Sequence, residues 1–443
     1  PAQPLPESSE RPGSEQFIAA ASAVGDKLEL LAHCGADDAA WVGLTLVNEK
    51  HWSLMPMGAE LYAGVSGVAL FLAYLGHLTR EERYTTLARK AWQTVRRQAG
   101  LQKSAPVSIS CFNGLSGLIY VETHLNALWG EPDLLAEAEE MVARLRPFIE
   151  RDEDYDIIGG AAGCLGTLLG LYRHTASASA LSAAVLCGEH LCAHSTNAGD
   201  GLGWLSRVAP RIPLTGFSHG SAGIAWALLQ LAEVTGEARF RRTALAAIEY
   251  ERGLYSPVAH NWPDLRSSST QEPTGAGLSA AAHSPQAAPP HVFTSAWCHG
   301  APGIGLARLR SLGQLDDDDA TRAEIHAALE TTLAEGFGLN HSLCHGDLGN
   351  LDFVMQTSVM FPEPEMHARR ERLAARVLAS IETYGWLCGV PNGVETPGLM
   401  TGLAGIGYGL LRLAAPARVP SVLALAPPLS APSAKPEGET AIA

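Results

Sequence analysis

The stretch Gly64-Val-Ser-Gly-Val-Ala-Leu-Phe-Leu-Ala-Tyr-Leu75 shows the pattern of the whole chain, because its Gly-x-x-Gly element opens a long apolar run. The same element recurs along the sequence and opens an apolar run each time. Its seven copies begin at Gly64, Gly114, Gly160, Gly220, Gly300, Gly346 and Gly402. One Gly-x-x-Gly is a weak signal, since glycine occurs in many turns. Seven copies that each open a helix indicate a repeat architecture.

More polar helices are predicted between the apolar runs, with charges on one face and aliphatic side chains on the other. They span residues 79–98, 132–149, 240–255, 318–335 and 367–384. The first starts with a capping box formed by Thr79 and Glu82, and the second has Pro132 in its first turn. The period-two alternation of strands is almost absent.

This alternation of apolar and amphipathic helices predicts two concentric layers, with the apolar helices inside. Seven such units could build an open superhelix or a closed ring. An open solenoid needs polar capping repeats at its ends, whereas the last repeat, from Gly402, is as apolar as the middle ones. We therefore predict an all-α fold, a closed α/α toroid of seven inner and seven outer helices.

The chain of 443 residues divides into three parts in this prediction. Residues 1–15 form a linker, residues 16–416 the toroid, and residues 417–443 an Ala/Pro-rich tail. Within the toroid, residues 267–290 are rich in Ser, Ala, Pro and Gly and are expected to form a flexible surface insertion. Because the sequence starts with proline rather than methionine, we expect it to be a segment of a longer protein.

The composition argues against several classes of protein. A formal net charge of −15 argues against nucleic-acid binding, which needs a basic patch for the phosphates. No apolar run approaches the ~20 residues that span a bilayer, and the N-terminus lacks the basic and apolar regions of a signal peptide. The eight cysteines show no disulfide spacing, which favours a reducing cytoplasm where free thiols can hold a metal.

Two nearly identical elements, Cys298-His299-Gly300 and Cys344-His345-Gly346, indicate a metal site. Both continue to a second glycine and read Cys-His-Gly-x-x-Gly. Two thiolates and one imidazole make three protein ligands, the number at a catalytic zinc with one open position. A structural zinc would need a fourth ligand and usually a Cys-x-x-Cys pair, which this sequence lacks. We therefore predict a catalytic Zn2+.

The position of the candidate residues within the repeat predicts that they converge. Cys298 and Cys344 stand two residues before the first glycine of their repeats, and His345 and His219 stand one residue before theirs. Asp156 lies four residues before the first glycine of the third repeat. Equivalent positions in a ring of repeats lie at the same height. These five side chains are therefore expected to line one rim of the central cavity.

Structural explanations compete with each of these assignments. The paired cysteines could be small core residues beside helix-start histidines, although two matching copies argue against it. His219 alone would be an ordinary hydrogen-bonded histidine, but its register favours a site. Asp156 could instead be an N-cap, and three acidic neighbours compete for its role. These neighbours are Asp152, Glu153 and Asp154.

Other residues of these types are not assigned to the metal. His299 is expected to lie beside the metal without binding it, and four other cysteines are expected in the core: Cys111, Cys164, Cys187 and Cys192.

The two Cys-His-Gly elements, with Trp297 before the first, and the seven Gly-x-x-Gly helical repeats resemble the lanthionine synthetase C-like cyclases. Three longer motifs are similar to the C-terminal cyclase domain of bifunctional class II lanthipeptide synthetases. They are Ser342-Leu-Cys-His-Gly-Asp-Leu-Gly-Asn350, Asn261-Trp-Pro-Asp-Leu-Arg266 and Thr396-Pro-Gly-Leu-Met-Thr-Gly402. The resemblance covers about Phe17 to Pro416. The chain differs from some single-domain members at one position. Those members have an arginine four residues before the first cysteine ligand, where this chain has Thr294, so the role of that arginine cannot be carried over.

The resemblance implies a zinc-containing double α/α toroid that closes thioether rings in a dehydrated precursor peptide. The zinc ligands would be Cys298, Cys344 and His345, and His219 and Asp156 would match the active-site histidine and aspartate. A peptide cysteine thiolate would add to the β-carbon of dehydroalanine or dehydrobutyrine. His219 would protonate the resulting enolate or, in the reverse assignment, take the thiol proton. An N-terminal dehydratase domain of the same polypeptide is the implied partner.

Two other functions stay open at this point. A protein prenyltransferase-like α/α barrel also activates a peptide thiol on zinc, but usually with a mixed Asp/Cys/His ligand set. A non-catalytic scaffold that contains zinc and binds a peptide or thiol is the alternative from another class. Reaction with a dehydrated precursor peptide distinguishes these functions.

Overall fold

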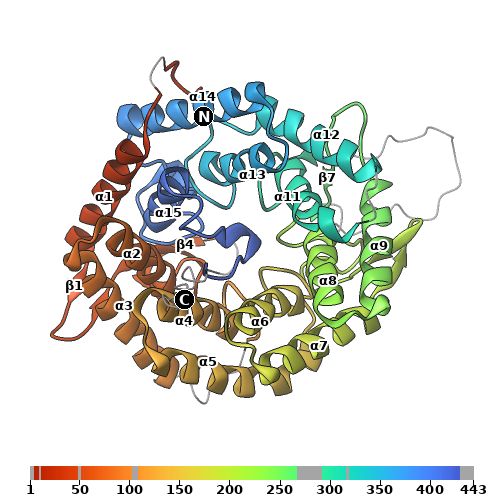
Figure 1. Ribbon diagram of the computed structural model, residues 1–443, viewed down its shortest axis with the longest axis horizontal. Coiled ribbons are helices and arrows are strands. Elements are labelled where there is room, and N and C mark those ends of the chain that lie inside the picture. Colours follow the sequence, from red (N-terminus) through yellow and green to blue (C-terminus); the bar gives the residue numbers. More distant parts are fainter. Residues whose placement is uncertain are drawn as a thin grey trace, which may run out of the picture.

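The computed structural model describes residues 4–8, 11–47, 51–101, 108–266, 292–315 and 319–429. Within these ranges, 14 α-helices form an inner and an outer ring (Figure 1). The inner helices are α2 (Val65–Thr79), α4 (Leu115–Trp129), α6 (Ala161–Thr175), α8 (Ser221–Thr235), α11 (Ala301–Ser311), α13 (Asp347–Met360) and α15 (Leu403–Ala414). The outer helices are α1 (Ser14–Leu31), α3 (Glu82–Leu101), α5 (Pro132–Leu145), α7 (Ala178–Ala193), α9 (Ala238–Arg252), α12 (Asp319–Glu335) and α14 (Pro364–Tyr384). The predicted all-α toroid is confirmed.

Each inner helix begins directly after the first glycine of its repeat. In the first repeat, Gly64 has an extended backbone with φ −93° and ψ −176°, and α2 starts at the next residue. The second glycine permits a close contact between the turn and the helix. A Cβ on Gly349, for example, would overlap the carbonyl oxygen of Leu343. The inner helices are buried nearly all round, which explains their apolar sequences.

A ring of backbone hydrogen bonds closes the toroid. The residue two positions before the first glycine of each repeat donates its N–H to the carbonyl of the equivalent residue in the next repeat. The seven bonds run Tyr62→Phe112 (2.9 Å), Phe112→Ile158 (3.3 Å), Ile158→Ser218 (3.2 Å), Ser218→Cys298 (3.4 Å), Cys298→Cys344 (3.3 Å), Cys344→Met400 (2.9 Å) and Met400→Tyr62 (2.8 Å). We call this set the backbone ring. An open superhelix would leave its first and last members unpaired, so the closed form is established.

The seventh repeat takes its outer helix from the other end of the chain. No outer helix follows α15 among the described residues, and α1 packs against it instead (Figure 1). The helix α1 has Phe17, Val24 and Leu28 on its buried face. The two ends of the chain are therefore joined by packing as well as by the backbone ring.

Two local features differ from the sequence prediction. The outer helix predicted from residue 79 begins only at Glu82, because Thr79 ends α2, where its hydroxyl donates to the carbonyl of Leu75. Four two-stranded antiparallel sheets were also not predicted, because most of their strands are too short to show alternation. They pair β1 (His33–Cys34) with β2 (Ala39–Ala40), β3 (Val42–Val47) with β4 (His51–Pro56), β5 (Thr196–Ala198) with β6 (Gly201–Gly203), and β7 (Pro263–Asp264) with β8 (Val292–Phe293).

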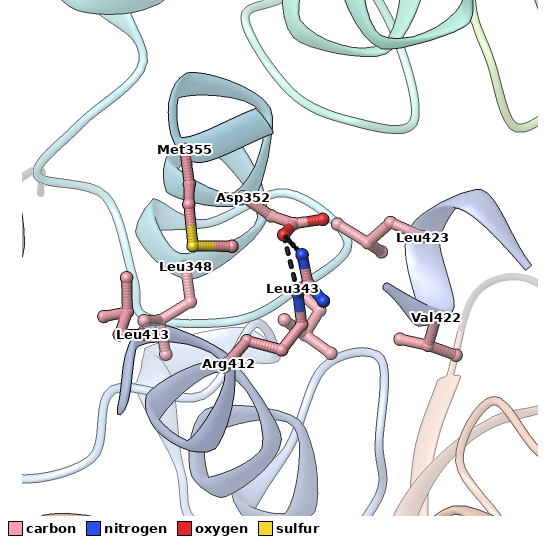
Figure 2. Close-up of a pocket in the computed structure, with 9 residues that line it drawn as sticks. Leu343, Leu348, Asp352, Met355, Arg412, Leu413, Val422 and Leu423 are labelled. Carbon is pink, nitrogen blue, oxygen red and sulfur yellow. Dashed lines mark hydrogen bonds and ion pairs between the residues drawn. The ribbon is translucent and has the colours of Figure 1, made fainter. Parts of the chain in front are cut away.

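Part of the segment predicted as a tail packs inside the ring, where residues 419–425 are buried. The short 3-10 helix η5 (Val422–Ala424) lies in the middle of the toroid and is buried (Figure 1). Asp352 on α13 binds both Arg412 on α15 and the hydroxyl of Ser421, and Figure 2 shows the ion pair beside Leu423. This part of the segment thus belongs to the core, because buried polar groups of two inner helices hold it.

Other predicted segments fall outside the described residues. The expected insertion at residues 267–290 and the last part of the expected tail, residues 430–443, are among them. None of the helices that the structure describes combines the length and apolarity needed to cross a bilayer.

Candidate metal centre

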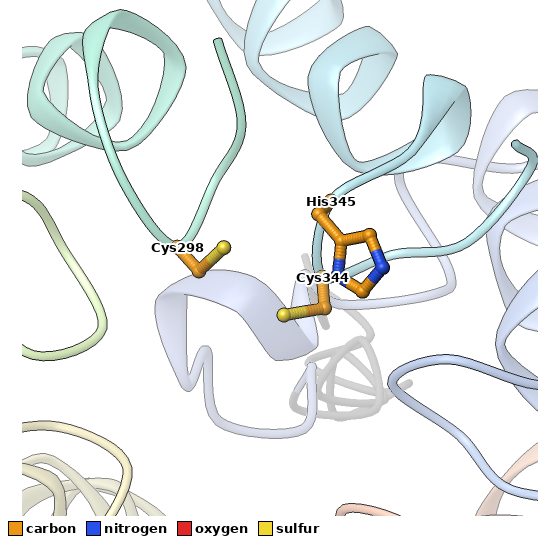
Figure 3. Close-up of side chains that lie close together, drawn as sticks. All are labelled: Cys298, Cys344 and His345. Carbon is orange, nitrogen blue, oxygen red and sulfur yellow. The ribbon is translucent and has the colours of Figure 1, made fainter. Parts of the chain in front are cut away.

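The three predicted zinc ligands come together at one rim of the toroid. Cys298 lies in the turn before α11, and Cys344 and His345 lie in the turn before α13. One ligand atom from each lies within 4.8 Å of the others. Figure 3 shows both sulfurs and the imidazole facing a common space. Two soft sulfur donors and one imidazole at such distances fit a zinc with one position left open.

The orientation of His345 leaves a nitrogen free for a metal. Its Nε2 lies 3.1 Å from the carbonyl oxygen of Gly389, and a donated hydrogen bond there leaves Nδ1 as the ligand atom. Gly389 has no room for a side chain, because a Cβ would lie 2.8 Å from Nε2 and 2.6 Å from Oγ of Ser342. This glycine was not predicted as part of the site. It stands outside the repeat and offers no signal in the sequence.

The two sulfurs influence each other strongly. The hydrogen bond from Cys298, opposed by burial, and a second hydrogen bond from Tyr62 lower the pKa of Cys344. The hydrogen bond with Cys344, and then burial, raise the pKa of Cys298. Tyr62 Oη lies 3.1 Å from Cys344 Sγ, and burial raises the pKa of the phenol, which therefore keeps its proton and donates. These shifts favour the thiolate form at Cys344 over Cys298.

A histidine–aspartate pair adjoins the ligands. His219 Nδ1 lies 2.7 Å from Asp156 Oδ2, and the side chain of Asp156 is buried. Ser218, next in the chain, donates its hydroxyl to the carbonyl oxygen of Cys298 at 2.9 Å. Burial opposes protonation of His219, but the charge and hydrogen bond of Asp156 outweigh it, and an electrostatic contribution of Cys298 adds to them, so that the pKa of His219 is raised.

Two acidic neighbours of Asp156 bind other groups than His219. The carboxylate of Asp152 accepts the backbone N–H groups of Tyr155 and Ala161 at 2.9 and 2.8 Å, so it caps the turn and the start of α6. Asp154 forms an ion pair with Arg207. Asp156 combines both roles considered for it: its Oδ1 accepts the N–H of Gly159 at 2.6 Å in the turn before α6, and its Oδ2 holds His219.

His299 lies beside the centre and is not in the ligand group. Its ring stacks on His219 with 5.6 Å between ring centroids and 23° between planes. Burial and then the charge of Arg266 lower the pKa of His299 to about 3, so it stays neutral. The structure thus places the histidines of the two Cys-His-Gly elements differently, with His345 in the ligand group and His299 against His219.

Arg266 brings a positive charge that the sequence prediction did not assign to the site. Its guanidinium pairs with Asp264 at 2.6 Å, and the hydroxyl of Thr294 lies 3.4 Å from the same carboxylate. The hydrogen bond with Asp264, opposed by burial, raises the pKa of Arg266, and the charges of Cys298 and Cys344 raise it further. Thr294, which stands four residues before Cys298, therefore contacts the same carboxylate of Asp264 that binds Arg266. The only signal for Arg266 in the sequence was its place in the Asn261–Arg266 motif.

A cleft of about 560 Å³ opens next to the centre. It lies between the turn before α13 and the loop around residues 387–393, and its lining combines apolar side chains with backbone polar groups. The lining residues are Leu339, Asn340, His345, Leu387, Cys388, Gly389, Val390, Pro391, Asn392 and Gly393. Leu339 is 61% exposed at this position. His345 therefore borders this cleft with its side chain beside the two cysteines.

Known proteins share the sequence pattern and the fold of this chain. The sequence matches the Lanthionine synthetase C-like protein family over residues 55–424. It is 25% identical over 220 residues to the lacticin 481/lactococcin biosynthesis protein LcnDR2 of Lactococcus lactis subsp. lactis; the match covers 47% of this chain and spans only 21% of that relative. The fold is similar to nisin cyclase, with a TM-score of 0.60 and 18% identity over 93% of this chain and 96% of that one. The match over most of its length shows that this chain belongs to the lanthionine synthetase C-like family.

Proposed function

We propose that this chain is a zinc-dependent lanthipeptide cyclase. It would form lanthionine and methyllanthionine rings by adding peptide cysteine thiolates to dehydroalanine or dehydrobutyrine in a precursor peptide. One observation carries the proposal: the Cys298, Cys344 and His345 group adjoins the His219–Asp156 pair on one rim. The family match and the likeness to nisin cyclase support it.

The donor set fits the metal that this chemistry needs. Cys298, Cys344 and His345 would hold Zn2+, which supplies a positive charge that keeps the substrate thiol deprotonated at neutral pH. A free thiol has a pKa near ~8.5 and is mostly protonated there. Two ligand thiolates offset the charge of the ion, so the reacting sulfur stays electron-rich.

His219 is placed to deliver a proton. Addition of the thiolate forms the C–S bond at the β-carbon and leaves an enolate at the α-carbon, which needs one proton. Because Nδ1 of His219 is bonded to Asp156, Nε2 is the atom that faces the substrate. A protonated imidazole with a raised pKa can donate from Nε2 near neutral pH. Asp156 fixes the ring orientation and favours its charged form.

The cleft beside His345 is the proposed site for the peptide next to its reacting cysteine. Leu339, Leu387 and Val390 offer apolar contacts to side chains of the peptide. The backbone groups of the loop offer hydrogen bonds to its main chain. An extended peptide there would pass directly by the ligand His345.

The test is incubation of the zinc-loaded chain with a dehydrated precursor peptide. Cyclisation removes free thiols without changing the mass of the peptide, because addition neither gains nor loses atoms. Unchanged thiols with zinc bound would favour the non-catalytic scaffold. A gain of mass when a prenyl diphosphate is supplied would favour the prenyltransferase-like alternative.

Partner and location follow from this proposal. The Lactococcus relative is about five times as long as the matched region, which leaves room for further domains. The proposed partner is an N-terminal dehydratase domain of the same polypeptide. The site requires reduced thiols, and all eight cysteines of the structure are free. A reducing cytoplasm is therefore the proposed location.

A further inference from the structure

Tyr62 occupies the position in the first repeat that the two cysteine ligands occupy in theirs. It stands two residues before Gly64 and is a member of the backbone ring. Its carbonyl oxygen accepts the N–H of Met400, and the carbonyl of Met400 accepts the N–H of Cys344. Two hydrogen bonds of the ring therefore connect the backbones of Tyr62 and Cys344.

The side chain of Tyr62 reaches the sulfur of one ligand. Its Oη lies 3.1 Å from Sγ of Cys344. The ring packs edge-on against Phe112, with 6.2 Å between centroids and 77° between planes, so the hydroxyl is held in place. In the part of the chain that the structure describes, no hydroxyl makes the same contact with Cys298. The two sulfur ligands thus differ in their hydrogen bonding.

A cyclase that holds thiolates next to dehydroalanine has a chemical problem. The ligand thiolates are nucleophiles like the substrate thiolate, and each could add to the electrophile. In that side reaction a bond forms between Sγ and the β-carbon, the π electrons move to the α-carbon, and the α-carbon takes a proton from water. The product is a stable thioether, and the alkylated cysteine is a poor metal ligand.

A hydrogen bond to a thiolate reduces this reactivity. The donor stabilises the negative charge on sulfur, and nucleophilicity falls as the basicity of the sulfur falls. We propose that the Tyr62 hydroxyl protects Cys344 against alkylation by the dehydrated substrate, which leaves the substrate thiolate as the preferred nucleophile. This inference rests on the proposed cyclase function. Tyr62 is a positioning residue, since it acts through Cys344.

Alkylation by acrylamide tests this proposal without any precursor peptide. Acrylamide adds to thiolates in the same way as dehydroalanine. Peptide mapping by mass spectrometry then follows Cys344 and Cys298 separately in the zinc-loaded protein. Tyr62→Phe is expected to raise the alkylation rate of Cys344 about fivefold to tenfold, because the nucleophilicity of a thiolate follows about half of the change in basicity when one hydrogen bond to its charge is lost. The rate of Cys298, as internal reference, should stay within about twofold.

Two further variants make the result specific. Tyr408→Phe removes another buried hydroxyl, which donates to the carbonyl of Pro420 away from the ligands, and should leave both rates unchanged. Tyr62→Gln keeps an N–H donor and should restore part of the protection. It also provides a second variant if the phenylalanine protein does not fold.

Spectra of the cobalt-substituted protein give an independent measurement. Loss of the hydrogen bond should move the sulfur-to-cobalt charge-transfer band of Tyr62→Phe to longer wavelength, because the sulfur becomes easier to oxidise. Equal alkylation rates of Cys344 in wild type and Tyr62→Phe, with an unchanged band, would overturn the proposal. Protection of Cys344 in a chain that cyclises no peptide would instead refute only the cyclase function.

Discussion

The imidazole of His219 lies 2.7 Å from the carboxylate of Asp156, although 63 positions separate the two residues in the chain. Asp156 is only 2% exposed, so water screens its charge poorly. Burial alone would lower the pKa of His219, and the carboxylate raises it instead. The pair therefore keeps His219 protonated to a higher pH than an isolated histidine.

A pH profile tests this relationship. If His219 donates a proton, kcat/KM falls as the pH rises through the raised pKa of its imidazole. Asp156→Asn removes the charge and should move this descending limb about one pH unit or more to lower pH. Asp154→Asn, which breaks the pair with Arg207, should leave the limb in place. A rate that instead rises with pH through the same pKa would assign His219 as the base.

Zinc content tests the ligand group. Cys344→Ala removes one of three protein ligands and should lower the zinc bound per chain, measured by metal analysis after dialysis, at least about tenfold. Cys34→Ala alters an exposed cysteine outside the site and serves as the control. Zinc retained by Cys344→Ala at the wild-type level would refute the assignment.

Gly389→Ala tests the orientation of His345 without touching a ligand. The added methyl would press on Nε2 of His345 and Oγ of Ser342, so the imidazole must turn away from the sulfurs. Zinc affinity, measured by competition with a chelator, should fall about 10–100-fold. Gly100→Ala is the matched control, because its Cβ meets open space. Unchanged affinity in Gly389→Ala would show that the carbonyl contact is dispensable.

The cleft is tested by placing a charge in it. Leu339→Asp should raise the KM for the dehydrated precursor about tenfold, because a peptide side chain would lose an apolar contact and meet a carboxylate. The zinc content should not change. Val258→Asp introduces the same charge at a fully exposed valine outside the cleft. Equal KM values for both variants would place the peptide elsewhere.

The buried ion pair of Asp352 and Arg412 predicts a large loss of stability. The two side chains are 4% and 8% exposed, and they hold residues 419–421 against the inner helices. Arg412→Met would leave the carboxylate buried without a cation and should cost about 3–5 kcal/mol. Thermal unfolding by calorimetry would show a lower midpoint. Arg369→Met, which removes only exposed pairs, should cost less than about 1 kcal/mol.

The repeat made most of the fold predictable. Seven Gly-x-x-Gly elements locate every inner helix, because the close contact at the second glycine has the same sequence requirement each time. No range was predicted for the outer helices α1 and α7, and the buried residues 419–425 were predicted as part of a tail. The helix α1 and residues 419–425 are held by contacts with parts of the chain far away in sequence, such as α15 and Asp352, and no local pattern records such contacts.

The site was predictable where it follows the register of the repeat. Cys298, Cys344, His345 and His219 all stand one or two residues before a repeat glycine, and the structure places them on one rim. Tyr62 has the same register and was overlooked because tyrosine is not a usual zinc ligand. Gly389 and Arg266 lie outside the repeats, and only three-dimensional proximity relates them to the ligands.

The backbone ring has a consequence for how this scaffold can change over time. Its seven bonds use only main-chain groups, so any residue that keeps its N–H can stand at each position, and the chain has Tyr, Phe, Ile, Ser, Cys, Cys and Met there. Point substitutions can exchange the reactive groups on the rim while the closure stays intact. Gain or loss of a repeat, by contrast, would change the number of members in the backbone ring and disrupt its closure. New chemistry on this architecture is therefore expected to evolve by substitution at a constant number of repeats.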